Sequence, residues 1–69
     1  MEKLTDMLDY YVRACRRNAH DRHLCERFFD QAYGATEMYS LLNPEEENMV
    51  ADMWVTTYRP QFEAFVFGS

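Results

Sequence analysis

The sequence predicts an all-α fold, a small up-and-down bundle of three helices followed by a short C-terminal helical turn. Only two glycines and two prolines interrupt the 69 residues. No segment alternates apolar and polar residues as a half-buried strand does, whereas apolar residues recur at helical spacing along most of the chain. A chain of this length forms one domain, residues 1–69, and buries only about 60% of the surface of its unfolded state.

The first helix is predicted from about Lys3 to Asn18, because its apolar residues recur on one face. These residues are Leu4, Met7, Leu8, Tyr11, Val12 and Cys15. A second apolar stripe follows, displaced by roughly 140° or more around the same cylinder. It comprises Leu24, Phe28, Ala32, Ala35, Tyr39 and Leu42. Since one continuous helix would turn the two stripes toward different neighbours, we expect an elbow between Asn18 and His23.

At this elbow, Asn18 is expected to end the first helix in a left-handed conformation, and Asp21 is expected to cap the next helix. The second helix is then predicted from about Asp21 to Leu42. Its Gly34 costs about 1 kcal/mol relative to alanine. We therefore expect either a close approach of another backbone or a bend at this position.

The clearest helix start is the segment Asn43-Pro44-Glu45-Glu46. Its asparagine is a favoured N-cap, its proline suits the first helical position, and its second glutamate can complete a capping arrangement. The predicted buried face of this third helix comprises Met49, Val50, Met53, Trp54 and Thr57. The stripe loses phase near Pro60, and proline disrupts a helix interior. The third helix is therefore predicted to end near Tyr58, and a short helical turn to cover Pro60 to Val66.

Charge is segregated along the chain. The elbow region, Arg13 to Arg27, holds five arginines against two acidic residues and carries +3, so the remainder carries −8 if the whole chain is to reach −5. Glu45 to Glu47 lie at the opposite end of the second helix, roughly 30 Å away at 1.5 Å per residue. This separation exceeds a Debye length of about 8 Å, so the two groups do not pair within one bundle. An antiparallel two-fold dimer would bring the basic end of one copy to the acidic end of the other.

The basic elbow suggests two kinds of contact. Its arginines can meet an anionic protein surface, or they can bind nucleic acid in the manner of a helix-turn-helix protein. They are Arg13, Arg16, Arg17, Arg22 and Arg27. The acidic balance of the whole chain and the lack of a glycine in the turn weigh against nucleic acid.

Aromatic residues make up 16% of the chain, which is more bulky apolar surface than so small a monomer readily encloses. We therefore predict self-association, most simply as a homodimer. The C-terminal aromatic residues have two interpretations: they fold back over the open end of the bundle, or they form part of an interface. The candidate interface residues are Trp54, Tyr58, Phe62 and Phe65.

No cofactor, metal ion or catalytic machinery is predicted. Four metal-capable residues lie close together in sequence, but their spacing does not fit zinc ligands. They are Cys15, His20, His23 and Cys25. Neither serine lies in a nucleophile motif, and no glycine-rich phosphate loop is present. The chain also lacks both a run of roughly 20 apolar residues that could span a bilayer and a signal-peptide pattern, so no membrane contact and a cytoplasmic location are expected.

These features favour a small, non-enzymatic protein–protein interaction module of a regulatory or adaptor type, which self-associates and binds another protein. The alternative is a nucleic-acid-binding regulator that uses the basic elbow, Arg13 to Arg27.

Overall fold

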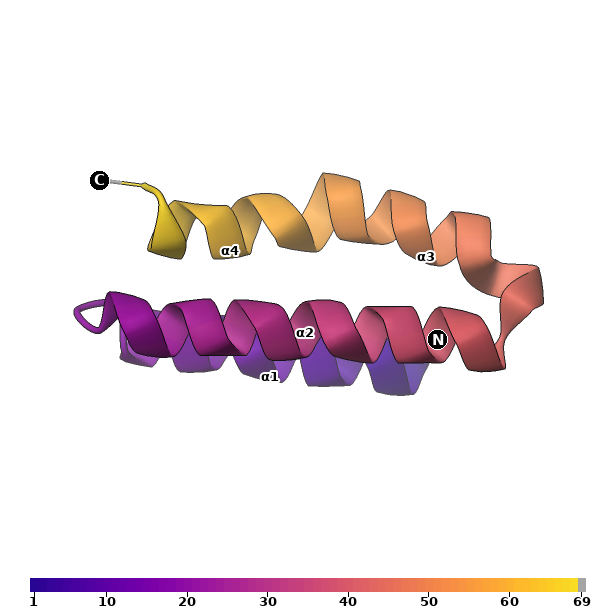
Figure 1. Cartoon of the computed structure of the whole chain (residues 1–69), viewed down its shortest axis with the longest axis horizontal. Helices are drawn as coiled ribbons and strands as arrows, with labels where there is room; N and C mark the ends of the chain where they lie inside the picture. The colour runs from indigo at the N-terminus through magenta and orange to yellow at the C-terminus, as the bar shows by residue number, and fades with distance from the viewer. Residues whose placement is uncertain (69) are drawn as a thin grey trace.

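Three helical rods pack side by side in a computed structural model, which describes residues 1–68 (Figure 1). The first rod is α1 and the second is α2; the third is built from four short segments in line. The elements are α1 (Glu2–Arg17), α2 (Arg22–Leu42), the 3₁₀ turn η1 (Pro44–Glu46), α3 (Glu47–Met53), the π-helical segment η2 (Trp54–Tyr58) and α4 (Arg59–Val66). The predicted all-α, three-helix arrangement is confirmed.

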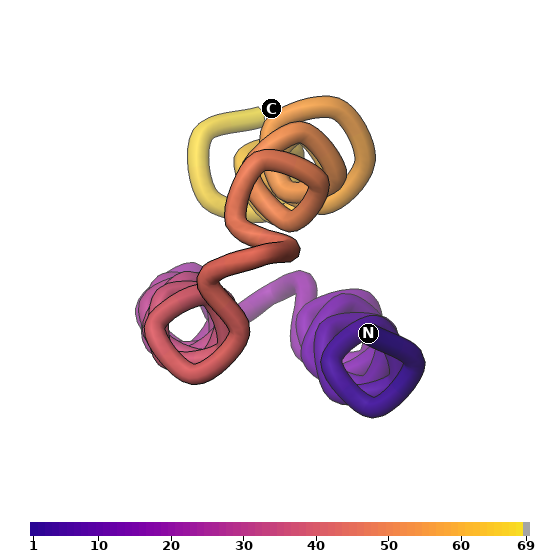
Figure 2. The backbone as a smooth tube through the Cα atoms, turned by 90° about the vertical axis from the view of Figure 1, so that its right-hand side faces the viewer, coloured from indigo at the N-terminus to yellow at the C-terminus, as the bar shows by residue number. Residues whose placement is uncertain are grey.

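The bundle is elongated, with principal extents of 38 × 17 × 16 Å. Viewed end-on, the three rods occupy the corners of a triangle (Figure 2). The α1–α2 elbow lies at one end of the long axis, and the turn from α2 into α3 lies at the other (Figure 1). The basic and acidic regions of the sequence are therefore separated along the molecule, as expected. Among residues 1–68, no helix is long and apolar enough to cross a membrane.

One hydrophobic core runs along the bundle axis and includes side chains from all three rods. Its buried members are Leu4, Leu8, Val12, Cys15, Cys25, Ala32, Val50, Trp54, Tyr58, Phe62 and Val66. Four residues of the predicted stripes are exposed, and the prediction that they are buried is wrong: Met7, Leu42, Met49 and Thr57. Leu42 is 74% exposed, and Figure 1 shows a reason, because α2 extends past the N-terminal end of α1. The last turn of α2 therefore has no α1 to cover it.

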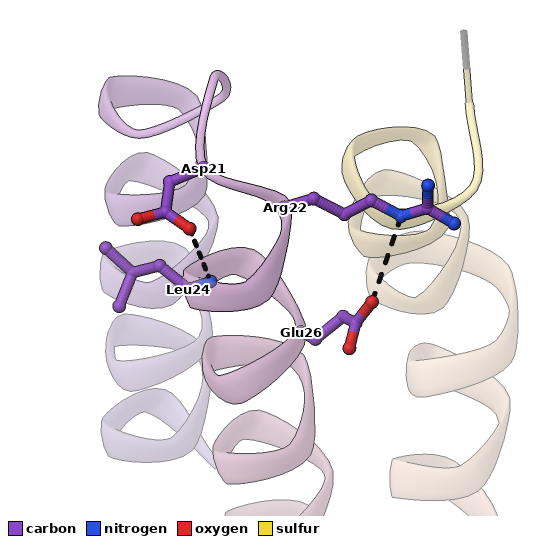
Figure 3. Close-up of polar contacts among 4 residues, drawn as sticks. All are labelled: Asp21, Arg22, Leu24 and Glu26. Carbon is purple, nitrogen blue, oxygen red and sulfur yellow. Dashed lines mark hydrogen bonds and ion pairs between the residues drawn. The ribbon is translucent and has the colours of Figure 1, made fainter.

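The elbow is capped by side chains on both sides. Asp21 is the N-cap of α2, as predicted, because its Oδ1 accepts the Leu24 N–H at 3.1 Å (Figure 3). The predicted left-handed conformation of Asn18 is wrong, since its φ is −121°. Its side-chain Nδ2 instead donates to the Ala14 carbonyl at 2.8 Å. The Asn18 backbone N–H also donates to the Ala14 and Cys15 carbonyls, so the last turn of α1 is capped without a left-handed residue.

The third rod begins at Pro44, which occupies a first-turn position of η1 as predicted. The predicted capping arrangement is wrong, because Asn43 makes no side-chain cap. Its Nδ2 donates to the Tyr39 carbonyl at 3.0 Å, and the Tyr39 hydroxyl donates to Glu46 Oε2 at 2.8 Å. Asn43 therefore caps the C-terminal end of α2 instead of the start of η1. The Tyr39–Glu46 hydrogen bond is the contact that ties the turn to α2.

The predicted end of the third helix near Tyr58 is wrong, because the rod continues there, and the predicted helical turn from Pro60 to Val66 is part of α4. The π-helical segment η2 leads directly into α4, and Pro60 sits in the first turn of α4, where a missing N–H is tolerated. Buried residues recur every four positions along the rod, at Val50, Trp54, Tyr58, Phe62 and Val66. On a regular α-helix each four-residue step drifts by about 40°. The wider π turn absorbs this drift, so α4 packs along α2 and α1, and the expected fold-back over the open end of the bundle is wrong.

Gly34 lies exposed on α2. A Cβ built there meets no heavy atom within 4 Å, so a close approach of another backbone does not account for this glycine.

Candidate interaction groove between α2 and α3

An open groove lies between the C-terminal half of α2 and the first half of the third rod, with a cavity volume of about 500 Å³. Small side chains from both walls line it: Thr36 and Ser40 on α2 and Ala51 on α3. The Thr36 hydroxyl is already bonded to the Ala32 carbonyl at 2.9 Å. The two helices are held together at the ends of this stretch, and the small residues between leave the space unfilled.

The floor of the groove is apolar. Val50 and Trp54 reach it from the core, and three exposed residues also line the groove: Tyr33, Leu41 and Val55, which are 50%, 76% and 53% exposed. Scattered single apolar side chains are normal on a protein surface, but a concave group of them indicates a binding site. This groove is therefore the best candidate for a contact surface among residues 1–68.

Trp54 joins the groove to the core. Its ring centroid lies 5.7 Å from that of Tyr33 on the groove side, and 6.0 and 5.8 Å from those of Phe29 and Phe62 inside the bundle. Phe29 and Phe62 are themselves stacked at 5.5 Å. Aromatic contacts of this kind contribute about 0.5–1.5 kcal/mol each beyond their buried area. The floor of the groove is therefore continuous with the aromatic part of the core through Trp54.

The rim of the groove is mainly acidic. Glu37 and Glu47 line it, and a hydrogen bond to the Glu37 carboxylate raises the pKa of Tyr33. The groove continues into a smaller hollow of about 320 Å³ beside Asp30 and Arg59. Arg59 also pairs with Glu63 on its own helix, Nε to Oε2, at 3.2 Å. A partner on this surface therefore meets apolar groups in the centre and mostly negative charge at the edges.

The five elbow arginines are all exposed, as a contact role requires, but they do not share one face. Arg22 and Arg27 are five residues apart on α2, which places them about 140° apart around the helix. Arg22 also lies 3.8 Å from Glu26, Nε to Oε1, in a solvent-exposed pair (Figure 3). Such pairs contribute only about 0.3–0.5 kcal/mol. Arg13, Arg16 and Arg17 project from α1 on sides that the core does not occupy.

The structure places three of the four candidate interface residues inside the monomer. Trp54, Tyr58 and Phe62 are buried, and Phe65 is partly buried against the core. Tyr58 also crosses the bundle, because its hydroxyl donates to Asp9 Oδ1 on α1 at 2.7 Å. The pKa of Tyr58 is raised to about 12, mainly by burial and to a smaller extent by the hydrogen bond to the Asp9 carboxylate. Of the four, only Trp54 also lines the groove.

Sequence reasoning missed Tyr33, Leu41 and Val55. All three lie beside the buried stripes, where a simple two-sided view of a helix assigns them to solvent. A usable signal was present, because α2 and the η2 segment of the third rod both carry large apolar residues next to the stripe. The sequence did not indicate that these two flanks face the same groove.

The four metal-capable residues of the elbow are divided between core and surface. Cys15 and Cys25 are fully buried and face each other, with Cys25 Sγ 3.6 Å from the Cys15 carbonyl and 3.4 Å from the Asn18 carbonyl. The pKa of Cys15 is raised to about 12, mainly by burial and to a smaller extent by the neighbouring Cys25 thiol. His20 and His23 are exposed. Both sulfur atoms are therefore enclosed within the elbow, in contact with backbone carbonyl oxygens and away from the two histidines at the surface.

Comparisons of this chain with protein-family models, with curated proteins and with solved structures found no match.

Proposed function

We propose that this protein is a small helical protein-binding module of a regulatory or adaptor type, and that it self-associates. The observation that carries the proposal is the groove between α2 and α3, where Tyr33, Leu41 and Val55 present apolar surface around the edge of Trp54. Aromatic side chains are enriched at interface cores, and hot spots are enriched in tryptophan and tyrosine.

The separation of charge supports self-association in particular. The basic elbow and the acidic turn lie at opposite ends of a 38 Å molecule. Neither end can neutralise the other within one copy, because the distance is several Debye lengths. A second copy in the reverse direction satisfies both ends at once.

Light scattering behind size exclusion tests this function over a dilution series in low salt. The expected result is a molar mass that rises from 8.3 kDa toward twice that value as the concentration increases. A mass that stays at 8.3 kDa throughout the micromolar range contradicts self-association.

The exposure of all five elbow arginines supports nucleic-acid binding as the alternative function. Fluorescence anisotropy of a labelled duplex at about 50 and 200 mM salt tests it, because phosphate contacts weaken steeply over this range. Binding that is lost at the higher salt and in the double variant Arg17→Glu, Arg22→Glu would favour this alternative. No anisotropy change at the lower salt would remove it.

A further inference from the structure

We propose that the groove between α2 and α3 binds a basic amphipathic helix of another protein. The apolar face of that helix lies over Trp54, and its lysine or arginine side chains lie beside the acidic rim. This inference rests on the proposed protein-binding function and adds the chemistry and conformation of the partner.

The groove has the length and direction of a short helix. The residues of α2 that line the groove and the adjoining hollow share one face of the helix, from Phe29 to Leu41. These two residues are twelve positions apart, so the stretch is roughly 18 Å long. The third rod runs alongside as the other wall, from Pro44 to Arg59 (Figure 1). A helix of about three turns has the same length as the groove.

The walls determine the conformation of the partner. Both walls are helical, so within residues 1–68 an extended peptide finds no strand edge to pair with. A helix needs no such edge, because its own backbone groups are bonded internally and only its side chains contact the groove. Helices that dock in this way place apolar residues at positions i, i+3 or i+4, and i+7 against the partner.

The centre of the groove accepts these apolar residues. Leu41 and Val55 are exposed beside Trp54, and Ser40 and Ala51 line the space with short side chains. The volume of about 500 Å³ lies within the range of roughly 300–1,000 Å³ that is usual for ligand pockets. Apolar side chains of a docked helix can therefore enter between the walls.

The charges around the groove select a basic partner. Three exposed carboxylates line the groove or the hollow: Asp30 and Glu37 on α2, and Glu47 on α3. Within residues 1–68, none of the three lies in an ion pair. Arg59 is the cation of the lining, and it already pairs with Glu63 on its own helix. The uncompensated charge of the groove is therefore negative.

The positions of the carboxylates fit both flanks of a docked helix. Asp30 and Glu37 are seven residues, or about two turns, apart on one wall, and Glu47 is on the other. A helix with basic residues on both sides of its apolar face therefore meets an acidic side chain on each wall. The hydrogen bond between Tyr33 and Glu37 leaves the negative charge in place. The net charge of −5 also attracts a basic partner from a distance.

A second copy of this chain does not offer the same chemistry. Its arginines are grouped at the elbow, where the apolar faces of α1 and α2 are buried in the core, and Arg22 already lies beside Glu26. Two grooves placed face to face would oppose the same carboxylates. The occupant with the required basic and apolar groups is therefore another protein.

Binding is tested with labelled peptides and the full chain in low salt. Each peptide of the panel has about 16 residues, with leucine, phenylalanine or tryptophan at positions i, i+4 and i+7 and lysine on both flanks. One control peptide has glutamate in place of every lysine, and another has the same residues in an order that leaves no apolar face. Fluorescence anisotropy is expected to show binding of a lysine peptide, and at least about tenfold weaker binding of both controls.

The acidic rim is tested by reversing its charge. The double variant Asp30→Lys, Glu37→Lys is expected to weaken binding of the lysine peptide by about tenfold or more and to strengthen binding of the glutamate peptide. Glu2→Lys with Asp6→Lys is the matched control, because it changes the net charge equally but lies on α1, which contributes no residue to the described groove. This control is expected to weaken binding by less than about threefold, because salt screens distant charges.

The apolar centre is tested without a change of charge. Leu41→Ser with Val55→Ser removes two exposed side chains of the groove and is expected to weaken binding by about tenfold. Met7→Ser with Met38→Ser is the control, because these side chains are also exposed, at 45% and 57%, but do not line the described groove. Circular dichroism verifies that every variant is folded.

The outcomes separate this inference from the proposed function. If no peptide binds but light scattering shows self-association, the inference is overturned and self-association stands. If the chain is monomeric and no peptide binds, both fail. A monomeric chain that binds the lysine peptide through the groove supports the inference and removes self-association.

Three further results would overturn the inference while a protein-binding function stands. The first is equal binding of the lysine and glutamate peptides. The second is an equal loss of binding in the rim variant and its α1 control, because net charge alone would then explain the binding. The third is dissociation of a self-associated chain in the variant Leu41→Ser, Val55→Ser, because a second copy would then occupy the groove.

Discussion

The helix–helix contact between α1 and α2, called here the first seam, is closed. The contact between α2 and α3, the second seam, opens into a groove of about 500 Å³. Small residues line both seams. In the first, Cys15, Cys25 and Ala32 are fully buried, and the thiols contact the carbonyls of the opposite helix. In the second, Ser40 and Ala51 line open space. Small side chains alone therefore do not decide whether a seam closes.

The difference comes from where the third rod is held. Its beginning is tied to α2 by the Tyr39–Glu46 hydrogen bond, and its second half is fixed by Trp54 and Phe62 against Phe29. Between these two attachments, small residues face each other across a fixed gap. The first seam buries its side chains, and the second leaves apolar side chains exposed around an open groove.

The largest predicted effect is at the attachment of the third rod. Phe62→Ala removes a fully buried ring that stacks on Phe29 and Trp54, and is expected to cost about 3–5 kcal/mol in the free energy of unfolding. Since a chain of this size has roughly 3–10 kcal/mol in total, the variant is expected to be largely unfolded at 37 °C. Thermal unfolding by circular dichroism measures this. Phe67→Ala is the control, because this ring is exposed; equal stability of the two variants would refute the attachment.

The second prediction compares the two seams directly. Ala32→Leu places a larger side chain in the closed seam and is expected to destabilise the protein by about 1–3 kcal/mol through overpacking. Ala51→Leu makes the same chemical change in the groove, where space is available, and is expected to change stability by less than about 0.5 kcal/mol. Urea unfolding at low protein concentration compares them. If both substitutions cost the same, the seams do not differ in packing.

The third prediction concerns the polar contact that joins the third rod to α1. Tyr58→Phe removes the hydrogen bond to Asp9 and is expected to cost about 1 kcal/mol, because Asp9 is exposed and regains water. The pKa of Tyr58 is raised from 10.0 to about 12 in the folded state. Its contribution is therefore complete below about pH 10 and is lost as the pH rises toward 12.

The same alkaline window includes Cys15, whose pKa is raised from 9.0 to about 12. Urea midpoints measured from about pH 8 to 11 are expected to fall with rising pH, and to fall less steeply in Tyr58→Phe than in the wild type. An identical slope in the two proteins would show that Tyr58 does not contribute.

The smallest predicted effect is stabilising. Gly34→Ala adds a Cβ that meets no neighbour and is expected to increase the free energy of unfolding by about 0.5–1 kcal/mol. Gly68→Ala is the matched comparison, because a Cβ there meets the Ala64 carbonyl oxygen. No gain from Gly34→Ala would indicate a conformational role for this glycine that its surroundings do not show.

Local signals in the sequence predicted the fold well. The phase shift between the two stripes required the elbow, and Asp21 and Pro44 marked two helix starts correctly. The predicted cap failed because Asn43 caps the end of α2 through the Tyr39 carbonyl, and because Glu46 accepts a hydrogen bond from the Tyr39 hydroxyl. The continuation of the third rod through Pro60 was missed because the wide turn before it has no clear sequence signature.

The groove was less predictable than the fold. Periodicity identifies the face of each helix that is buried, but it does not identify which flanks of two helices meet. Tyr33 on α2 and Val55 on the third rod are 22 residues apart in sequence and come together only because the third rod lies along α2. The charge separation, in contrast, could be predicted from the sequence, because the length of α2 alone sets the distance between the basic elbow and the acidic turn.

Amide hydrogen exchange at two protein concentrations tests the difference between the seams most directly. At low concentration, α3 is expected to exchange faster than α1, because it is held at its ends beside an open groove. If the proposed self-association uses the groove, raising the concentration is expected to slow exchange selectively in α3 and in the C-terminal half of α2, while the outer face of α1 changes least. Selective protection of α1, or no dependence on concentration, would contradict the account.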